Sequence, residues 1–213
     1  SVGSFAQDNE YVEEVVSIGT RGKPRSVSSS PVPVDVLSAE DISKTGTDDL
    51  LMQLQGSIPS LNVHLQPISD AASMIRPANL RGLSADSTLI TTNGKRRHHA
   101  SVIAFQGGGV NDGSQGADIS VIPAIALKRV EVLRDGASAQ YGSDAIAGVI
   151  NFVLDDISEG GSLSYKMGEY TEGDGATTTI AGKYGMPLGQ DGFVTTSFQI
   201  RQADDTSRSA QRP

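Results

Sequence analysis

The chain has 213 residues, of which 37% are apolar and 20% are charged, with 24 glycines and no cysteine. The missing cysteines exclude disulfide scaffolds, cysteine-ligated metal sites and thiol catalysis, and the net charge of −8 argues against nucleic acid as a partner. The glycine content and an aromatic fraction of only 5% favour short strands joined by many turns.

Residues 1–31 have the composition of a flexible linker, rich in Gly, Pro and Ser. Such a segment buries too little apolar surface to order itself. Ser4-Phe5-Ala6 has the small-x-small spacing that precedes a signal-peptidase cut, so the first residues are either the tail of an export signal or a plain polar N-terminus. The short apolar patch at 15–18 is of the kind that adds a strand to a partner's sheet.

Residues 32–155 have the pattern of a compact domain. A strand is expected around Val34 and Val36, and Ser38 stands at the N-cap position of a short helix. Thr47 is expected to cap a second helix, with acidic residues in its first turn. Asn93-Gly94 predicts a hairpin turn. Further strands are expected at 61–64, 79–83, 89–92, 129–133 and 149–154, with a helical turn at 123–127 and a short helix at 137–141.

Short strands and helices without a strict βαβ alternation indicate an α+β domain with a small mixed sheet. Residues 98–118 are expected to form a long glycine-rich loop. In a compact domain such a loop is usually functional or disordered.

From residue 162 the pattern changes to strict alternation. Leu163, Tyr165 and Met167 alternate with polar residues, and two further alternating segments follow at 180–186 and 194–200. Such segments of about ten residues are typical of antiparallel transmembrane β-barrel strands. Because three strands cannot close a barrel, residues 162–213 are predicted to be the first strands of an incomplete one.

Three parts of the chain resemble TonB-dependent outer-membrane receptors. The segment EEVVSIGTR at 13–21 is similar to the region of the TonB box. The segments RPANLRGL at 76–83 and LITTNGKRR at 89–97 are similar to the middle of the plug domain, and VEVLRDGASAQYGSDAIAGVIN at 130–151 is similar to its end. Thr91-Thr92 departs from the aliphatic residues that are usual before the Asn-Gly turn.

The resemblance implies a plug domain lodged in a 22-stranded barrel in the outer membrane of a Gram-negative bacterium. The N-terminus would be periplasmic, and the barrel would be the chain's own or a partner's, surrounded by outer-membrane lipid. The external ligand would be a siderophore, cobalamin, a sugar or a peptide. Uptake would use energy delivered by TonB, with ExbB and ExbD in the inner membrane. The TonB-binding residues would be Glu13, Glu14, Val15, Val16, Ser17 and Ile18.

Two further roles are implied by the resemblance. Arg81 and Arg134 match family arginines that pair with glutamates on the inner barrel wall, and the guanidinium fork suits a bidentate carboxylate contact. His98, His99 and Phe105 fall in the loop that would face the external ligand. Adjacent histidines lack the i, i+4 spacing of metal ligands, so no metal is assigned and a plain solvent-exposed loop stays open as the alternative.

No catalytic constellation is recognisable, so neither an enzyme nor a cofactor is expected. The alternative to a receptor is a plug-like structural or interaction subunit of a larger outer-membrane assembly that does not itself transport.

Overall fold

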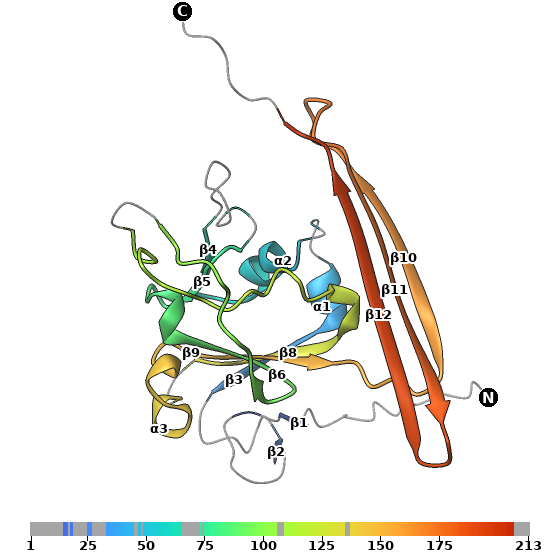
Figure 1. Cartoon of the computed structure of the whole chain (residues 1–213), viewed down its shortest axis with the longest axis horizontal. Helices are drawn as coiled ribbons and strands as arrows, with labels where there is room; N and C mark the ends of the chain where they lie inside the picture. Colours follow the sequence, from blue (N-terminus) through green and yellow to red (C-terminus); the bar gives the residue numbers. More distant parts are fainter. Residues whose placement is uncertain are drawn as a thin grey trace, which may run out of the picture.

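The computed structural model of the protein describes residues 15–16, 18, 25–26, 33–44, 47, 49–64, 73, 75–105, 109–134 and 137–206. Its main body is a five-stranded mixed sheet in the order β3-β8-β9-β6-β7 (Figure 1). Strands β6 and β9 are parallel and the other neighbours are antiparallel. The strands span Val34–Ser38 (β3), Thr88–Thr92 (β6), Lys95–Arg96 (β7), Leu127–Leu133 (β8) and Gly148–Leu154 (β9).

One face of this sheet is covered by the helices α1 (Ala39–Ser43) and α2 (Leu50–Ser57). Side chains of a strand alternate between the two faces, and those on the helical side form the larger core. Phe152 at its centre is fully buried. The core joins strand residues Val130, Val132, Ile150 and Phe152 to helix residues Ile42, Leu50, Leu51 and Leu54.

Both helices begin at side-chain caps, but the second cap is not the predicted one. Ser38 Oγ accepts a hydrogen bond from the backbone N–H of Asp41 at 3.1 Å, as expected. At α2, Asp49 Oδ1 accepts from two N–H groups of the first turn at 3.0 and 3.3 Å. Thr47 Oγ1 instead accepts from the N–H of Asp49 at 3.2 Å. The prediction of Thr47 as the cap is therefore wrong, because Thr and Asp both suit this position and the pattern does not separate them.

The remaining short elements connect the sheet to its surroundings. Asn93 and Gly94 have φ values of 49° and 74° and join β6 to β7, which confirms the hairpin turn and makes it type I′. Gly148 has φ +146°, and a Cβ there would lie 2.4 Å from the carbonyl oxygen of Leu133, so only glycine fits.

The remaining strands and helices are short. They are β1 (Val15–Val16), β2 (Arg25–Ser26), β4 (Leu61–Val63), β5 (Ala78–Leu80), α3 (Ser138–Tyr141) and the 3₁₀ turns at 85–87, 124–126 and 143–145.

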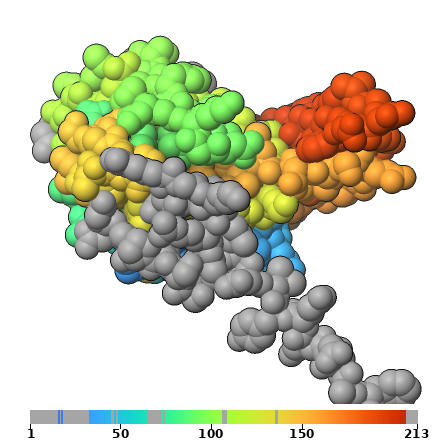
Figure 2. All heavy atoms as spheres, turned by 90° about the horizontal axis from the view of Figure 1, so that it is seen from below, coloured from blue at the N-terminus to red at the C-terminus, as the bar shows by residue number. Residues whose placement is uncertain are grey.

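A separate antiparallel sheet stands beside this body in the order β10-β11-β12. Its strands are β10 (Gly160–Gly168), β11 (Thr177–Leu188) and β12 (Gly192–Ala203). The register places Tyr165, Ile180 and Ile200 in one row. These three side chains are exposed on the outer face, together with Leu163, Met167, Tyr184, Met186, Val194 and Phe198. The view from below in Figure 2 shows the three strands projecting to one side of the main body.

An ion pair and a hydrogen bond tie the separate sheet to the segment that follows β9. Lys183 on β11 forms an ion pair with Asp155, just after β9. Thr195 Oγ1 on β12 donates a hydrogen bond to the carbonyl oxygen of Ile157 at 2.8 Å. The predicted fold class, an α+β domain with a small mixed sheet followed by antiparallel strands, is confirmed. No helix in the described part of the chain is long and apolar enough to cross a membrane.

The stability of the main body should depend strongly on the phenyl ring of Phe152, which lies at the centre of the larger core. Phe152→Ala is expected to lower the free energy of unfolding of the main body by about 3–5 kcal/mol, because the side chain leaves a cavity in a packed core. The measurement is the urea dependence of hydrogen exchange at the β8 and β9 amides, made in detergent that covers the outer face of β10–β12. Ile146→Ala, at an exposed position, is the control and should change little. Similar effects of the two variants would contradict the assigned core.

Candidate functional site

The predicted TonB-binding segment packs against the face of the sheet opposite to the helices (Figure 1). Strand β1 pairs with β2, with Val16 opposite Arg25. Val16 and Ile18 are only 1% and 2% exposed. They belong to a second core cluster formed with Val34, Leu89, Leu133, Ala137, Ala145 and Val149.

For the described residues Val16 and Ile18, this packing corrects the expectation that the N-terminal segment buries too little apolar surface to order itself. The face of the sheet opposite to α1 and α2, called the lower face below, carries apolar residues from β3, β6, β8 and β9. Such a face is stable only when it is covered from water. Burial of one Val and one Ile side chain is worth about 1.5–3 kcal/mol each, so these two contacts hold the segment by about 3–6 kcal/mol. Glu13, Glu14 and Ser17 lie outside the described residues.

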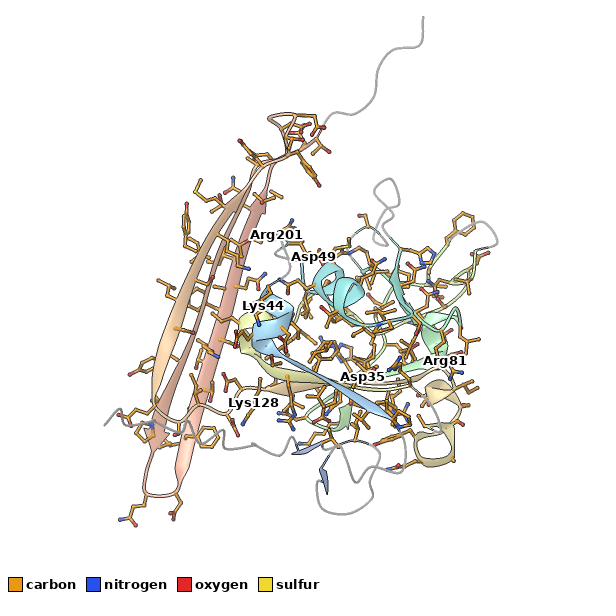
Figure 3. All side chains as sticks on the ribbon, turned by 180° about the vertical axis from the view of Figure 1, so that it is seen from behind. Asp35, Lys44, Asp49, Arg81, Lys128 and Arg201 are labelled. Carbon is orange, nitrogen blue, oxygen red and sulfur yellow. The ribbon has the colours of Figure 1, made fainter. Side chains whose placement is uncertain are left out.

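The two arginines singled out by sequence lie next to each other. Arg81 follows β5 with φ 59°, and its Nη1 donates a hydrogen bond to the carbonyl oxygen of Arg134 at 2.9 Å. Arg134 itself contacts Asp35 on β3 through two nitrogens, with Nη2 2.8 Å from Oδ1 and Nε 2.7 Å from Oδ2. Figure 3 shows Asp35 and Arg81 at the end of the sheet away from β10–β12.

Sequence reasoning missed Asp35, because it stands 99 positions from Arg134 and only the pairing of β3 with β8 brings them together. Pairing of the arginines with wall glutamates stays a prediction.

The three predicted ligand-contact residues lie in the glycine-rich loop. His98, His99 and Phe105 are all exposed, Phe105 at 79%. The ring of His99 contacts the carbonyl oxygen of Gln115 through Nδ1, and residue 99 forms a β-bridge with Ala117. The loop lies on the same side of the sheet as α1 and α2, away from β1 (Figure 1).

The loop is anchored by an asparagine that sequence reasoning did not single out. Asn111 is fully buried. Its Oδ1 accepts from the N–H of Ala85 at 2.9 Å, and its Nδ2 donates to Asn79 Oδ1 at 3.0 Å. This buried amide connects the loop to β5 and to the turn before β6. An asparagine within a glycine-rich run signals only a turn, so its long-range role was not readable from sequence.

Lys44 and Lys128 on the main body form exposed ion pairs with neighbouring aspartates. Hydrogen bonds from Ser38 and Lys44 hold the pKa of Asp41 below its usual value. A hydrogen bond from Lys128 likewise lowers the pKa of Asp156. Such exposed pairs contribute little to stability. In the part of the chain that the structure describes, no three His, Asp or Glu residues come close enough to hold a metal ion.

The chain was compared with known families. The model of the TonB-dependent receptor plug domain matches residues 26–149, more than half of the chain. The chain belongs to this family. The family predicted from the three sequence segments is thereby confirmed.

Two curated bacterial relatives match this chain over a part of their own length. The chain is 29% identical over 154 residues to an iron-regulated outer membrane virulence protein of Vibrio cholerae, covering 72% of this chain and 22% of the relative. It is 32% identical over 120 residues to the ferric enterobactin receptor of Pseudomonas aeruginosa, covering 56% of this chain and 16% of the relative. The chain thus spans less than a quarter of their length. The predicted outer-membrane localisation is confirmed, and these relatives are not named as enzymes.

Solved structures show the same arrangement of plug and strands. A mutant of the ferric enterobactin receptor from Pseudomonas aeruginosa superposes with a TM-score of 0.64 at 26% identity, over 82% of this chain and 25% of that one. The unliganded ferric citrate transporter FecA superposes with a TM-score of 0.58 at 19% identity, over 82% of this chain and 26% of that one, and shows the fold alone.

A charged side chain at position 16 should release the N-terminal segment from the sheet, because Val16 is part of the second core cluster. Val16→Asp is expected to speed trypsin cleavage after Arg25 by about tenfold or more, because burial of an unpaired carboxylate costs as much as the segment's own packing provides. The measurement is limited proteolysis of the chain in detergent. The matched control is Val121→Asp, the same change at an exposed valine. Equal cleavage rates in both variants would show that Val16 does not hold the segment.

Proposed function

We propose that the chain is the plug and the first wall strands of an outer-membrane receptor that imports an iron chelate. The main observation behind the proposal is that the two faces of the β10–β12 sheet differ in polarity. The outer face is apolar and exposed, whereas the inner face presents Ser164, Lys183 and Gln199 toward the plug. Apolar-out and polar-in is the pattern of a strand between lipid and a barrel interior.

The edges of the three-stranded sheet support a wall that continues. Among the described strands, β10 and β12 each pair only with β11, so their outer edges carry unpaired backbone groups. Open edges are not viable in the hydrocarbon core of a membrane, which favours closure by further strands into the 22-stranded barrel of the family. A cavity of about 300 Å³ lies between the wall and the part of the plug formed by α1 and the 3₁₀ turn at 124–126, although that turn also contacts β11 and β12.

Coupling to TonB is assigned to residues 13–18. A short apolar segment with free backbone groups can add a strand to a partner's sheet, and TonB, driven by ExbB and ExbD, is the partner in this family. Because Val16 and Ile18 are buried, TonB can reach the segment only after it leaves the lower sheet face. The modest packing energy of two side chains makes this release feasible on binding.

The external ligand is assigned to the loop that Asn111 anchors. Phe105 and Ile103 are exposed there beside His98 and His99. A relative is named as a receptor for ferric enterobactin, which favours an iron chelate over the cobalamin, sugar or peptide that the resemblance also allowed. Exposed aromatic and imidazole rings provide a surface on which a bulky ligand can pack.

Removal of the TonB segment tests the function directly. Deletion of residues 13–18 in the complete receptor should abolish energised uptake of ferric enterobactin while surface binding stays near wild type. Val15→Pro should act similarly, because proline lacks the N–H that an added strand donates. Val15→Thr keeps that N–H and is the control. Undiminished uptake by the deletion variant would refute the coupling role.

The ligand assignment has its own test. Phe105→Ala in the complete receptor is expected to weaken ferric enterobactin binding by about tenfold, since one ring contact of about 1.4 kcal/mol is lost. Binding is measured on intact cells by ligand titration. Ile146→Ala, another exposed apolar residue beside α3, should bind like wild type. An affinity of the Phe105 variant within error of that control would remove the loop from the binding site.

A further inference from the structure

The guanidinium of Arg134 is oriented by a carboxylate of the plug itself. Asp35 contacts Nη2 at 2.8 Å and Nε at 2.7 Å. Arg134 Nη2 donates a hydrogen bond to Oδ1 and Nε lies within ion-pair distance of Oδ2, so the carboxylate restricts the plane and direction of the guanidinium. Both side chains are about one-third exposed, 36% for Arg134 and 35% for Asp35, so the pair lies at the plug surface.

Arg134 keeps donors for a second partner. A guanidinium has five N–H donors in a fixed fork, and Asp35 contacts only the edge formed by Nε and Nη2. Among the residues that the structure describes, the opposite edge, which includes Nη1, has no hydrogen-bond partner. Arg134 can therefore bind another carboxylate without leaving Asp35.

Asp35 also reduces the electrostatic repulsion between Arg81 and Arg134. The hydrogen bond from Arg81 Nη1 to the carbonyl oxygen of Arg134 brings two cationic residues to one corner of the plug. A carboxylate close to two guanidinium groups lowers their mutual repulsion and lets the two cationic residues lie at one corner.

The position of this corner identifies which part of a wall it faces. The 3₁₀ turn at 124–126 precedes β8 and lies against β11 and β12, whereas Arg134 follows the far end of β8. Seven strand residues place the two ends roughly 20 Å apart. Figure 3 likewise shows Asp35 and Arg81 away from β10–β12. The partner would lie across the barrel from the first three strands.

We propose that Asp35 is a positioning residue that holds Arg134 in the direction needed to bind a carboxylate on the wall opposite β10–β12. The proposal rests on the proposed function, a plug seated inside a closed barrel. The contact between plug and wall would then involve three groups, which are the wall carboxylate, Arg134 and Asp35 on the edge strand β3.

The test measures plug seating in the complete receptor. Receptors are reconstituted in lipid vesicles, and leakage of a hydrophilic dye through unseated barrels is followed as urea is raised. Asp35→Asn, which keeps the size of the side chain, is expected to raise the leak up to about fivefold, the effect of losing a half-exposed ion pair. Arg134→Ala should raise it further, because a wall carboxylate is left unpaired. The matched control is Asp144→Asn, which removes an ion pair of similar exposure elsewhere on the plug, with Arg96, and should leave the leak unchanged.

Non-additivity distinguishes positioning from general stabilisation. If Asp35 acts through Arg134, the double variant Asp35→Asn with Arg134→Ala leaks no more than Arg134→Ala alone. An additive double variant, or an Asp35→Asn receptor as tight as wild type beside a leaky Arg134→Ala, would overturn the positioning role and leave wall pairing intact. A tight Arg134→Ala receptor would overturn both, whereas loss of uptake on deleting residues 13–18 would still support the receptor function.

Discussion

The five-stranded sheet has two apolar faces, and the need to cover both determines how the plug is built. Helices α1 and α2 cover one face. The other face is covered by Val16 and Ile18 from the N-terminal segment, together with Ala137 and Ala145 at the ends of α3 and the following 3₁₀ turn. The residues assigned to TonB binding are therefore also core residues. Binding of the segment by a partner would uncover apolar surface, which makes coupling and plug stability parts of the same equilibrium.

A buried polar row on that lower face holds the strands in register. Glu131 is fully buried, pairs with Arg129 at 2.8 Å and accepts from Asn151 Nδ2 at 3.0 Å. Asn151 Oδ1 in turn accepts from Thr91 Oγ1 at 2.8 Å and from the N–H of Gly94 at 2.9 Å. A slip of one residue would bury these groups unpaired. The row also explains why a polar residue stands at position 91, where the family usually has an aliphatic one.

The plug and the wall strands meet through few specific contacts. The ion pair of Lys183 with Asp155 and the hydrogen bond from Thr195 tie the wall to the segment after β9. Elsewhere a cavity of about 300 Å³ with serine and glutamine side chains in its lining lies between them. An incompletely packed interface holds two parts of a protein together less firmly than a closely packed one.

The sequence by itself determined the features whose causes are local. The Ser38 cap, the Asn93-Gly94 turn and the alternation on β10–β12 each depend on residues within a few positions of one another, so their patterns could be recognised directly. The cap at Asp49 was missed by two positions, because neighbouring polar residues compete equally for that role. The family followed from three motifs in the correct order.

Only the tertiary structure decided how distant residues meet. Burial of Val16 and Ile18 requires a sheet face assembled from four strands, and the contact of Asp35 with Arg134 spans 99 positions. Asn111 reaches Asn79 across 32 positions in the same way. A composition typical of a linker predicts no burial, and a lone Asp, Asn or Arg shows no partner in sequence. These contacts exist because strand pairing brings remote positions to one edge or face, and that pairing is a property of the folded sheet.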